Sequence, residues 1–302
     1  MKNFIISTDS CTDLFRSFLT KNGVRYIVMK RVLNGKEIGE LYDSAGEFDA
    51  FYDSLKKGAK PTTVALNPTE MQLYFEDLLA KESEGDIIHI PLSSGLSATC
   101  ANAAAAAEEV NKTLLKDKGR KVYVVDSLGA TSAMDFLLYE LIKLRDQGVT
   151  TANAIRRAEE LRDHTHGWLI MSDLFNLRRG GRISGVKATI GTILNIKPII
   201  HLNAHGKLAI ENKMTGSRRA IEYIIGKMAD LGERHNKNFA TGTICIARTS
   251  QSQLFDDLRA AIREKYPQIQ IREGIVGPII GTHLGCGGAI VVFEGAERLD
   301  IN

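Results

Sequence analysis

Short apolar runs alternate with helical patterns along the first half of the chain. Four of these runs have the length and composition of buried strands, and they lie at 4–7, 25–29, 86–90 and 121–126. The clearest helical pattern spans 69–82 and follows Asn67 and Pro68, with Glu70 completing a helix-start signal. Strands that alternate with helices are typical of a parallel sheet, so the pattern predicts an α/β domain.

Three further helices are predicted in this half. Ser97 can cap the alanine-rich segment 98–110, and the segments 135–144 and 152–164 carry apolar positions at helical spacing. We expect these helices to flank the parallel sheet.

The pattern changes after His164. The segments 168–171 and 197–211 indicate strands, and the second contains a tight turn at 203–206, which favours antiparallel pairing. Further helices are expected near 217–231 and 251–265, and further strands at 243–247, 269–276 and 289–293. This half is therefore predicted to be an α+β domain with a mixed or antiparallel sheet, which divides the chain into 1–165 and 166–302.

One long uncharged stretch, 276–293, has the length of a membrane span. It contains five glycines, Pro278 and His283, so we interpret it as a strand, a glycine-rich loop and a second strand. No transmembrane segment is predicted.

Length and charge narrow the function classes. A chain of 302 residues is long for a single core, which agrees with two domains. The 39 basic and 36 acidic residues leave a net charge of +3, too small to attract nucleic acid across the surface. The four cysteines lie far apart without a C-x-x-C pair, which argues against disulfides and zinc and favours the cytoplasm.

Nucleotide and metal motifs are missing from the sequence. It contains no G-x-x-x-x-G-K-[ST] and no G-x-G-x-x-G, so we expect no ATP binding by this chain alone and no dinucleotide cofactor. Its histidine pairs lack a carboxylate at metal-ligand spacing, so no metal is predicted.

Hydroxyl groups follow the predicted strands at their carboxyl ends. Ser10 follows the first strand, and Ser93, Ser94 and Ser97 surround Gly95 after the third. Ligands of open α/β sheets bind at this edge, and the amino terminus of the following helix favours an anion. The alternative is a capped helix and a solvated turn.

Other polar residues admit both a functional and a structural interpretation. Thr62 and Thr63 precede the Asn67 helix and are either ligand hydroxyls or part of a plain loop. His283 lies between glycines, where a carboxylate or phosphate ligand would give a reason to hold it in place.

Three arginines surround a Gly-Gly pair. Their guanidinium groups suit phosphate or carboxylate, or the segment is an exposed loop with solvated charges. These arginines are Arg178, Arg179 and Arg182.

Seven segments together resemble the DegV family of bacterial fatty-acid-binding proteins. In order they are TDSCTDL, PTT, IPLSSGLSATCANA, VVDSLGA, LRRGGRISG, IGTILNIKPII and IGTHLGCGG, and they cover nearly the whole chain. The resemblance implies a two-domain α/β fold with a long-chain fatty acid, such as palmitate, between the domains. It also implies that threonine and serine hydroxyls hold the carboxylate.

The resemblance assigns roles to particular residues. Thr63 and Ser94 match the family's carboxylate-binding threonine and serine, His283 matches the histidine of its G-T-H loop, and Ser10 lies in the same cleft region. We include Thr62, Ser93 and Gly95 as their neighbours. In members that serve a fatty acid kinase, the residue matching Arg182 looks like part of the kinase-facing surface, and we group Arg178 and Arg179 with it.

The chain departs from the family pattern at three places. Val64 to Asn67 replace the usual S-Q-P-S, Thr215 stands where an arginine is frequent, and Cys286-Gly287-Gly288 replaces P-G-A. These changes bear on chain-length preference and kinase coupling.

The expected function is that of a lipid-binding subunit without turnover of its own. A partner kinase would supply ATP while this chain presents the carboxylate. The competing hypothesis is a serine esterase or phosphoesterase in which Ser94 or Ser10 attacks and His283 acts as base, oriented by Asp9 or Asp126.

Overall fold

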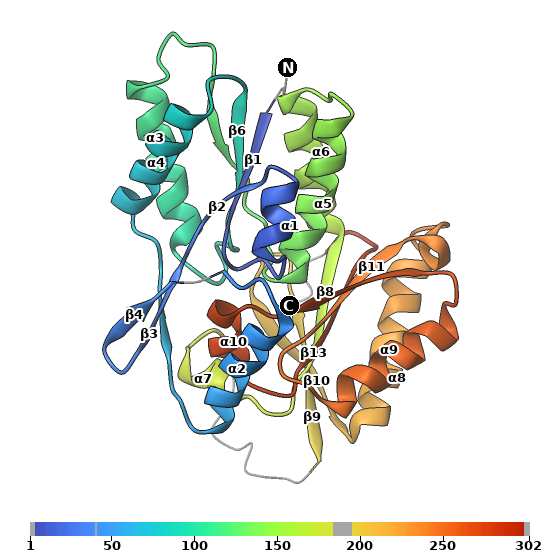
Figure 1. Cartoon of the computed structure of the whole chain (residues 1–302). Helices are drawn as coiled ribbons and strands as arrows, with labels where there is room; N and C mark the ends of the chain where they lie inside the picture. The colour runs from blue at the N-terminus through green and yellow to red at the C-terminus, as the bar shows by residue number, and fades with distance from the viewer. Residues whose placement is uncertain (1–3, 40, 184–194, 299–302) are drawn as a thin grey trace.

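The first half of the chain is built on a four-stranded parallel sheet, which confirms the predicted α/β architecture (Figure 1). The computed structural model describes residues 4–39, 41–183 and 195–298. The sheet has the order β2-β1-β6-β7, and its strands are β1 (Phe4–Asp9), β2 (Arg25–Ile27), β6 (Asp86–Ile90) and β7 (Val122–Val124). Side chains alternate between its faces: Ile5 and Ile87 point to one hydrophobic cluster, and Ile6 and Ile88 to another.

Helices cover both faces of this sheet. One face packs against α3 (Pro68–Lys81) and α4 (Thr99–Thr113), and the other against α1 (Arg16–Lys21), α5 (Ser132–Asp146) and α6 (Thr151–His164). The predicted start of α3 is confirmed, because Asn67 Oδ1 accepts a bond from the Glu70 amide at 2.9 Å. Helix α4 begins one residue later than its predicted cap implies, and the Ser97 hydroxyl accepts from the Thr99 amide.

The second half carries a mixed six-stranded sheet, as predicted. Its order is β10-β9-β8-β13-β11-β12, and among its neighbouring pairs only β11 and β12 run parallel. The strands are β8 (Thr165–Ile170), β9 (Ile196–Leu202), β10 (Leu208–Thr215), β11 (Thr243–Arg248), β12 (Gln270–Ile275) and β13 (Ala289–Glu294).

The outer face of the six-stranded sheet is covered by α8 (Ser217–Lys227) and α9 (Gln253–Lys265), which pack against Val291 and Phe293 of β13. A π-helical turn (Met228–Glu233) continues α8, and a short 3-10 turn (Phe239–Thr241) precedes β11. The opposite face of the sheet therefore turns toward the first half of the chain.

A third, small sheet was not predicted. It has the order β4-β3-β5, from β3 (Lys30–Leu33), β4 (Lys36–Ile38) and β5 (Thr62–Val64), and α2 (Ala45–Lys56) connects β4 to β5. Thr62 and Thr63 thus lie in a strand, where the loop interpretation was wrong. Their register is fixed by antiparallel pairing with β3, in which Arg31 faces Thr63.

The interpretation of 276–293 as strand, loop and strand was wrong in its first part. Residues Pro278–Leu284 form a helix, α10, which carries His283. Proline at the first helical position favours this start. Glycine at 281 is required, because a Cβ there would stand 2.6 Å from the Tyr52 hydroxyl. A short apolar run does not by itself distinguish a strand from a buried helix.

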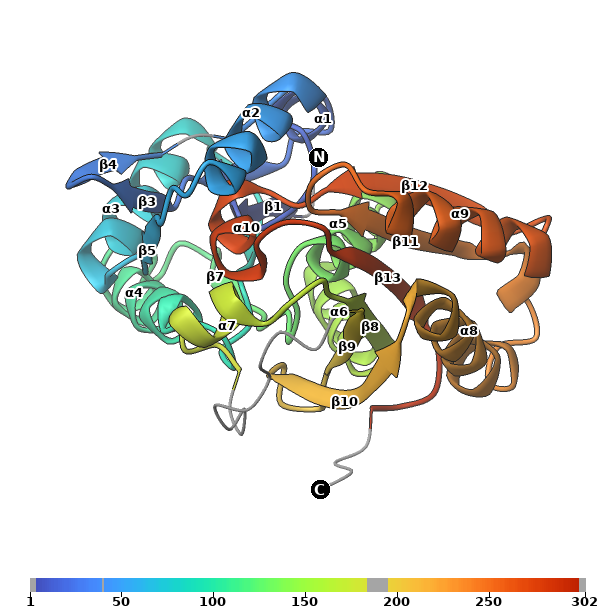
Figure 2. The same ribbon diagram turned by 90° about the horizontal axis from the view of Figure 1, so that it is seen from below.

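Helix α10 lies in the seam between the two halves. It packs against α2, β3 and β5 and against α7 (Phe175–Arg179), which lies beside it (Figure 2). Strand β8, the first strand of the six-stranded sheet along the chain, begins at Thr165. Helices α2 and α10, which come from different halves, nevertheless pack against each other across the seam. The division at 165/166 therefore stays a prediction. The first five residues of the IGTILNIKPII segment (190–194) and the end of LRRGGRISG (184–185) lie outside the described residues.

Candidate functional site

Thr63 and His283 meet in the seam although 220 positions separate them in the sequence. The hydroxyl of Thr63 lies 2.8 Å from Nε2 of His283. Strand β5 positions the threonine, and α10 presents the histidine from its last turn. The two residues that the sequence singled out from separate segments thus form one polar pair.

An apolar cavity begins at this pair. Its wall contains four polar or charged residues, Thr63, His283, Arg182 and Ser97. It is otherwise apolar, including Met29, Leu92, Leu177, Ile279 and Leu284. It has a volume of about 40 Å³. A few polar side chains on a largely apolar wall suit a ligand with one polar end.

A second apolar cavity continues the first toward the six-stranded sheet. Both cavities are lined by the same four side chains, Leu96, Leu208, Ile280 and Leu284. The second also has a volume of about 40 Å³, and Leu169, Ile290 and Val292 of the sheet form part of its wall. We call the two together the apolar slot. It extends within the seam from the Thr63–His283 pair to the six-stranded sheet.

A polar cavity of about 130 Å³ adjoins the pair and shares Thr63, His283 and Arg182 with the wall of the apolar slot. It is lined by Pro61, Thr62, Thr63, Arg179, Gly180, Arg182, Thr282 and His283. The guanidinium of Arg179 donates to the carbonyls of Pro61 at 2.8 Å and Thr282 at 3.3 Å, and Arg182 donates to the Leu96 carbonyl at 3.3 Å. Two cations therefore stand beside the polar end of the apolar slot.

His283 is held neutral in this environment. Its burial, together with the positive charges of Arg182 and Arg179, lowers the pKa of the imidazole to about 4. Its Nδ1 is buried and has no hydrogen-bond partner among the residues that the structure describes, and the Gly180 backbone packs against this side of the ring. Positive charge at the site at neutral pH therefore comes from the arginines, while the imidazole offers a neutral hydrogen-bonding group.

Ser10 and Asp9 organise the loop after β1 and stand apart from both cavity walls. Ser10 is buried, and its hydroxyl accepts a bond from the Met29 amide at 2.8 Å. Asp9 accepts bonds from the amides of Cys11 and Leu92, while its burial raises the pKa of its carboxyl. These bonds fix Met29 and Leu92, which themselves line the apolar slot.

Two of the three candidate residues in the loop after β6, Ser93 and Gly95, lie against the β9–β10 turn. Ser93 is buried and donates from its hydroxyl to the Gly206 carbonyl at 2.9 Å. Gly95 lies so close to His205 and Gly206 that a Cβ would collide with their backbone. Ser94 is exposed, and its amide donates to Asp126 at 3.2 Å. None of the three lines the described cavities, so their part in carboxylate binding stays a prediction.

The arginines proposed as a docking surface divide into two groups. Arg179 and Arg182 line the polar cavity, whereas Arg178 is exposed on α7. The docking role remains a prediction for all three, and the structure adds that two of them lie beside the Thr63–His283 pair.

Several cavity residues were not found from the sequence. Ser97, by contrast, was among the hydroxyls at the predicted ligand-binding edge, with a helix cap as the alternative, and it lines the apolar slot. Leu96, Leu208 and Ile280 form the shared wall, and apolar residues of this kind give no sequence signal that separates a binding wall from a core.

A larger cavity, about 340 Å³, lies elsewhere between the halves. Its wall carries Glu140, Lys143, Arg157, Arg272 and Glu294 and therefore differs in chemistry from the apolar slot. Within 4–39, 41–183 and 195–298, no group of three metal-ligating side chains gathers, and no helix is long and apolar enough to cross a membrane.

Comparison with known proteins gives concordant results. A family model described as an uncharacterised protein of the DegV family matches residues 3–295. A DegV domain-containing protein of Clostridium perfringens is 29% identical over 298 residues, which cover 99% of this chain and 99% of its own.

Two solved structures share the fold. DegV from Bacillus subtilis, described as a fatty acid binding protein, is 25% identical with a TM-score of 0.79, and the match covers 98% of this chain and 100% of that one. The Streptococcus pneumoniae fatty acid kinase B3 protein, loaded with linoleic acid, is 19% identical with a TM-score of 0.78, and the match covers 97% and 99%.

Proposed function

Because the chain belongs to the DegV family, we propose that it binds a long-chain fatty acid in the apolar slot, with the carboxylate at the Thr63–His283 pair. The observation that carries the proposal is the position of this pair in the wall of a largely apolar cavity that Arg182 also lines. Solved relatives with the same fold are described as binding fatty acids, which supports this class of ligand.

The tail supplies most of the favourable free energy in this proposal. A sixteen-carbon chain has about fifteen CH₂ and CH₃ groups at about 0.8 kcal/mol each, a gross transfer term of about 12 kcal/mol. Ordering of the chain and loss of its free motion offset part of this term. The apolar slot is lined by leucine, isoleucine and valine side chains, which give the tail an environment it prefers to water.

The carboxylate makes the free energy of binding less favourable, because it loses its hydrating water on binding and must recover those hydrogen bonds from the protein. The Thr63 hydroxyl can donate to it, and a bound carboxylate would favour the protonated form of His283. Arg179 and Arg182 supply positive charge in the adjoining polar cavity. These groups orient the ligand and limit the free energy lost when the carboxylate is dehydrated.

The apolar slot must widen to hold a long tail. Each of its two parts has a volume of about 40 Å³, enough for only about three water molecules. The shared wall of Leu96, Leu208, Ile280 and Leu284 comes from both halves of the chain. Binding of a long tail therefore requires these side chains to move apart.

The kinase part of the proposal extends from the same site. The carboxylate would attack the γ-phosphorus of ATP held by a partner kinase, with ADP as leaving group, so that this chain carries an acyl phosphate. One relative of the same fold is described as a fatty acid kinase B3 protein, which supports this direction. The chain itself would have no turnover and no cofactor, would act in the cytoplasm, and would contact the kinase through Arg178, Arg179 and Arg182.

The esterase alternative finds no support in the described geometry. His283 pairs with Thr63 rather than with Ser94 or Ser10, and its Nδ1 lacks a carboxylate partner. Asp9 and Asp126, the proposed orienting acids, accept bonds from backbone amides instead. A hydrolytic triad is therefore not assembled around this histidine.

A double substitution tests the proposal. In Thr63→Ala with Ser94→Ala we expect loss of retained lipid, because both hydroxyls that the family resemblance assigns to the carboxylate are removed. The control is Thr113→Ala on the exposed end of α4, whose hydroxyl bonds to the Glu109 carbonyl away from the slot. Lipid occupancy in the double variant equal to that of the native protein would refute the head-group assignment.

A further inference from the structure

The hairpin turn between β9 and β10 holds the two halves of the chain together beside the apolar slot. Leu202 and Leu208 flank this turn and line the slot from the second half, while Leu96 lines it from the first. The Ser93 hydroxyl donates to the Gly206 carbonyl, and Gly206 packs on the backbone of Leu128. Separation of these wall residues therefore requires the turn to part from the loops that follow β6 and β7.

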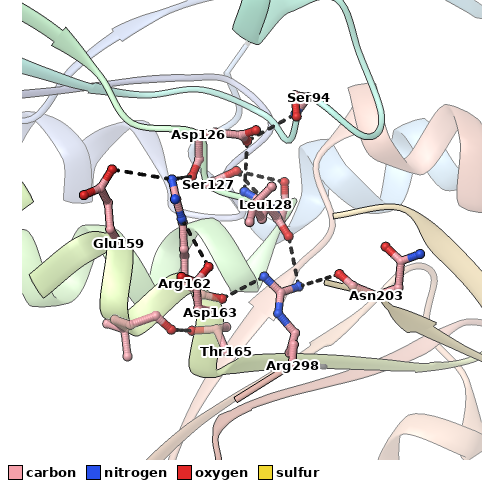
Figure 3. A network of polar contacts seen from close by, with 12 residues as sticks. Ser94, Asp126, Ser127, Leu128, Glu159, Arg162, Asp163, Thr165, Asn203 and Arg298 are labelled. Atoms are coloured by element: carbon pink, nitrogen blue, oxygen red, sulfur yellow. Dashed lines mark hydrogen bonds and ion pairs between the residues drawn. The ribbon is translucent and has the colours of Figure 1, made fainter. Parts of the chain in front are cut away.

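Arg298 fastens this junction from the C-terminal segment, as Figure 3 shows. Its Nη1 donates to the carbonyls of Leu128 at 3.2 Å and Asn203 at 3.1 Å, and its Nη2 donates to the Arg162 carbonyl at 2.7 Å. One guanidinium thus connects the loop after β7, the hairpin turn and helix α6. The first and last of these belong to one half of the chain, and the turn belongs to the other.

The guanidinium is buried, and within the described part of the chain it makes no hydrogen bond to a carboxylate. Arg298 is 8% exposed, and its three acceptors are main-chain carbonyls, so its position depends on those carbonyls staying together. A buried cation that loses a hydrogen-bonded partner is strongly disfavoured. Opening of the junction would break the hydrogen bond to Asn203 and leave those to Leu128 and Arg162. The cost of this lost bond favours the closed arrangement.

The same network reaches the loop that carries Ser94. Asp126 accepts from the amides of Ser94 and Leu128, and its own carbonyl accepts from the Arg162 guanidinium at 3.1 Å (Figure 3). The backbone of Arg298 is also anchored, because its amide donates to the Asp163 carbonyl at 2.8 Å. Arg298 is therefore held both at its backbone amide and at its guanidinium group. We call this set of hydrogen bonds the Arg298 clamp.

We propose that Arg298 is a positioning residue that controls fatty-acid exchange by holding the β9–β10 turn against the first half of the chain. This inference rests on the proposed binding of a fatty acid in the apolar slot. Since the slot must widen for a long tail, the rate of release follows the rate at which this junction opens.

The test compares release rates of cis-parinaric acid, a fluorescent eighteen-carbon fatty acid, from the full chain to excess albumin. Arg298→Met keeps the length of the side chain and removes its donors. We expect it to release the probe about tenfold faster or more, the factor that corresponds to losing one hydrogen bond to a charged group. Arg298→Lys retains the charge and is expected to fall between Arg298→Met and the native chain.

Arg145→Met is the matched control. The Arg145 side chain is 7% exposed and donates to the Asn22 carbonyl at 2.8 Å, entirely within the first half. It should lower stability toward urea but leave the release rate within about twofold, a margin well below the tenfold that one such hydrogen bond represents. Gly206→Ala perturbs the same junction from the other side, because the added methyl would meet Ser93 and Leu128. It should also accelerate release, and it carries the test if Arg298→Met does not fold.

The outcomes separate the inference from the proposed function. Faster release in Arg298→Met or Gly206→Ala, with Arg145→Met unchanged, supports the clamp. If the native chain binds the probe and neither junction variant changes release, or if Arg145→Met accelerates it equally, the clamp is refuted while fatty-acid binding stands. If the native chain does not bind the probe, both are refuted.

Discussion

Replacement of Thr63 by valine removes one hydroxyl from the site and little else. Valine has nearly the shape of threonine and suits strand β5, so the backbone pairing with β3 should persist. The 2.8 Å hydrogen bond to His283 is lost, together with the hydroxyl that would donate to a bound carboxylate.

The expected magnitude follows from the charge of the ligand. A hydrogen bond to a charged group contributes about 1.5–3 kcal/mol, so the Kd for a long-chain fatty acid should rise about 10- to 150-fold. The apolar slot is untouched, so the contribution of the tail should remain. The variant should therefore bind weakly rather than not at all.

Isothermal titration with oleate below its micelle concentration measures this change. Thr165→Val is the matched control, because its hydroxyl donates to the Leu161 carbonyl at 2.7 Å, away from the slot. That variant should lose stability, while its Kd stays within about twofold of the native value, a change of less than about 0.5 kcal/mol. An unchanged Kd in folded Thr63→Val would refute the placement of the carboxylate at this residue.

Three further predictions follow from the same geometry. Gly180→Ala should weaken binding, because the added methyl collides with the His283 ring and displaces it from Thr63; native affinity in calorimetry would contradict this. Binding between pH 5 and 6 should take up a proton. In the free protein His283 is neutral, because its pKa is lowered to about 4, and a bound carboxylate raises that pKa. Calorimetric titrations in buffers of different ionisation enthalpy measure the uptake, and a binding reaction without proton uptake would refute the prediction. Leu208→Phe should weaken palmitate more than octanoate, because it narrows the shared wall of the slot; equal losses would contradict that path for the tail.

The parallel sheet was predictable because its strands are buried on both faces. In β1 and β6, Ile6 and Ile88 face one hydrophobic cluster while their neighbours Ile5 and Ile87 face the other, so the apolar runs are continuous and stand out from the helices between them. Helix α3 was predictable from local bonds alone, since Asn67 and Glu70 satisfy each other's amides. In both cases the signal lies within a few residues of sequence.

Helix α10 and the small sheet depend on distant partners. The five glycines of the segment 276–293 argued against a helix. Within α10, however, residue 281 must be glycine because the Tyr52 hydroxyl lies against it. Strands β3 and β5 have three or four residues each and are defined by their pairing rather than by their composition. Such contacts leave no local pattern in the sequence.

The candidate site was predictable as a set of residues but not as an arrangement. Thr63 and His283 were both named from the sequence, while their mutual hydrogen bond and the neighbouring Arg179 and Arg182 required the folded chain. Ser94 was placed beside Thr63 by resemblance, yet its side chain is exposed and it lines neither cavity. The apolar wall could not be separated from an ordinary core, because both use the same side chains.

Identification of the lipid that the purified protein carries tests the central claim most directly. The protein is denatured, extracted with organic solvent, and the extract is analysed by mass spectrometry, with Thr63→Val prepared in parallel. The proposed function predicts a long-chain fatty acid in the native extract and less of it in the variant. No fatty acid in the native extract, together with no uptake of added oleate, would contradict it.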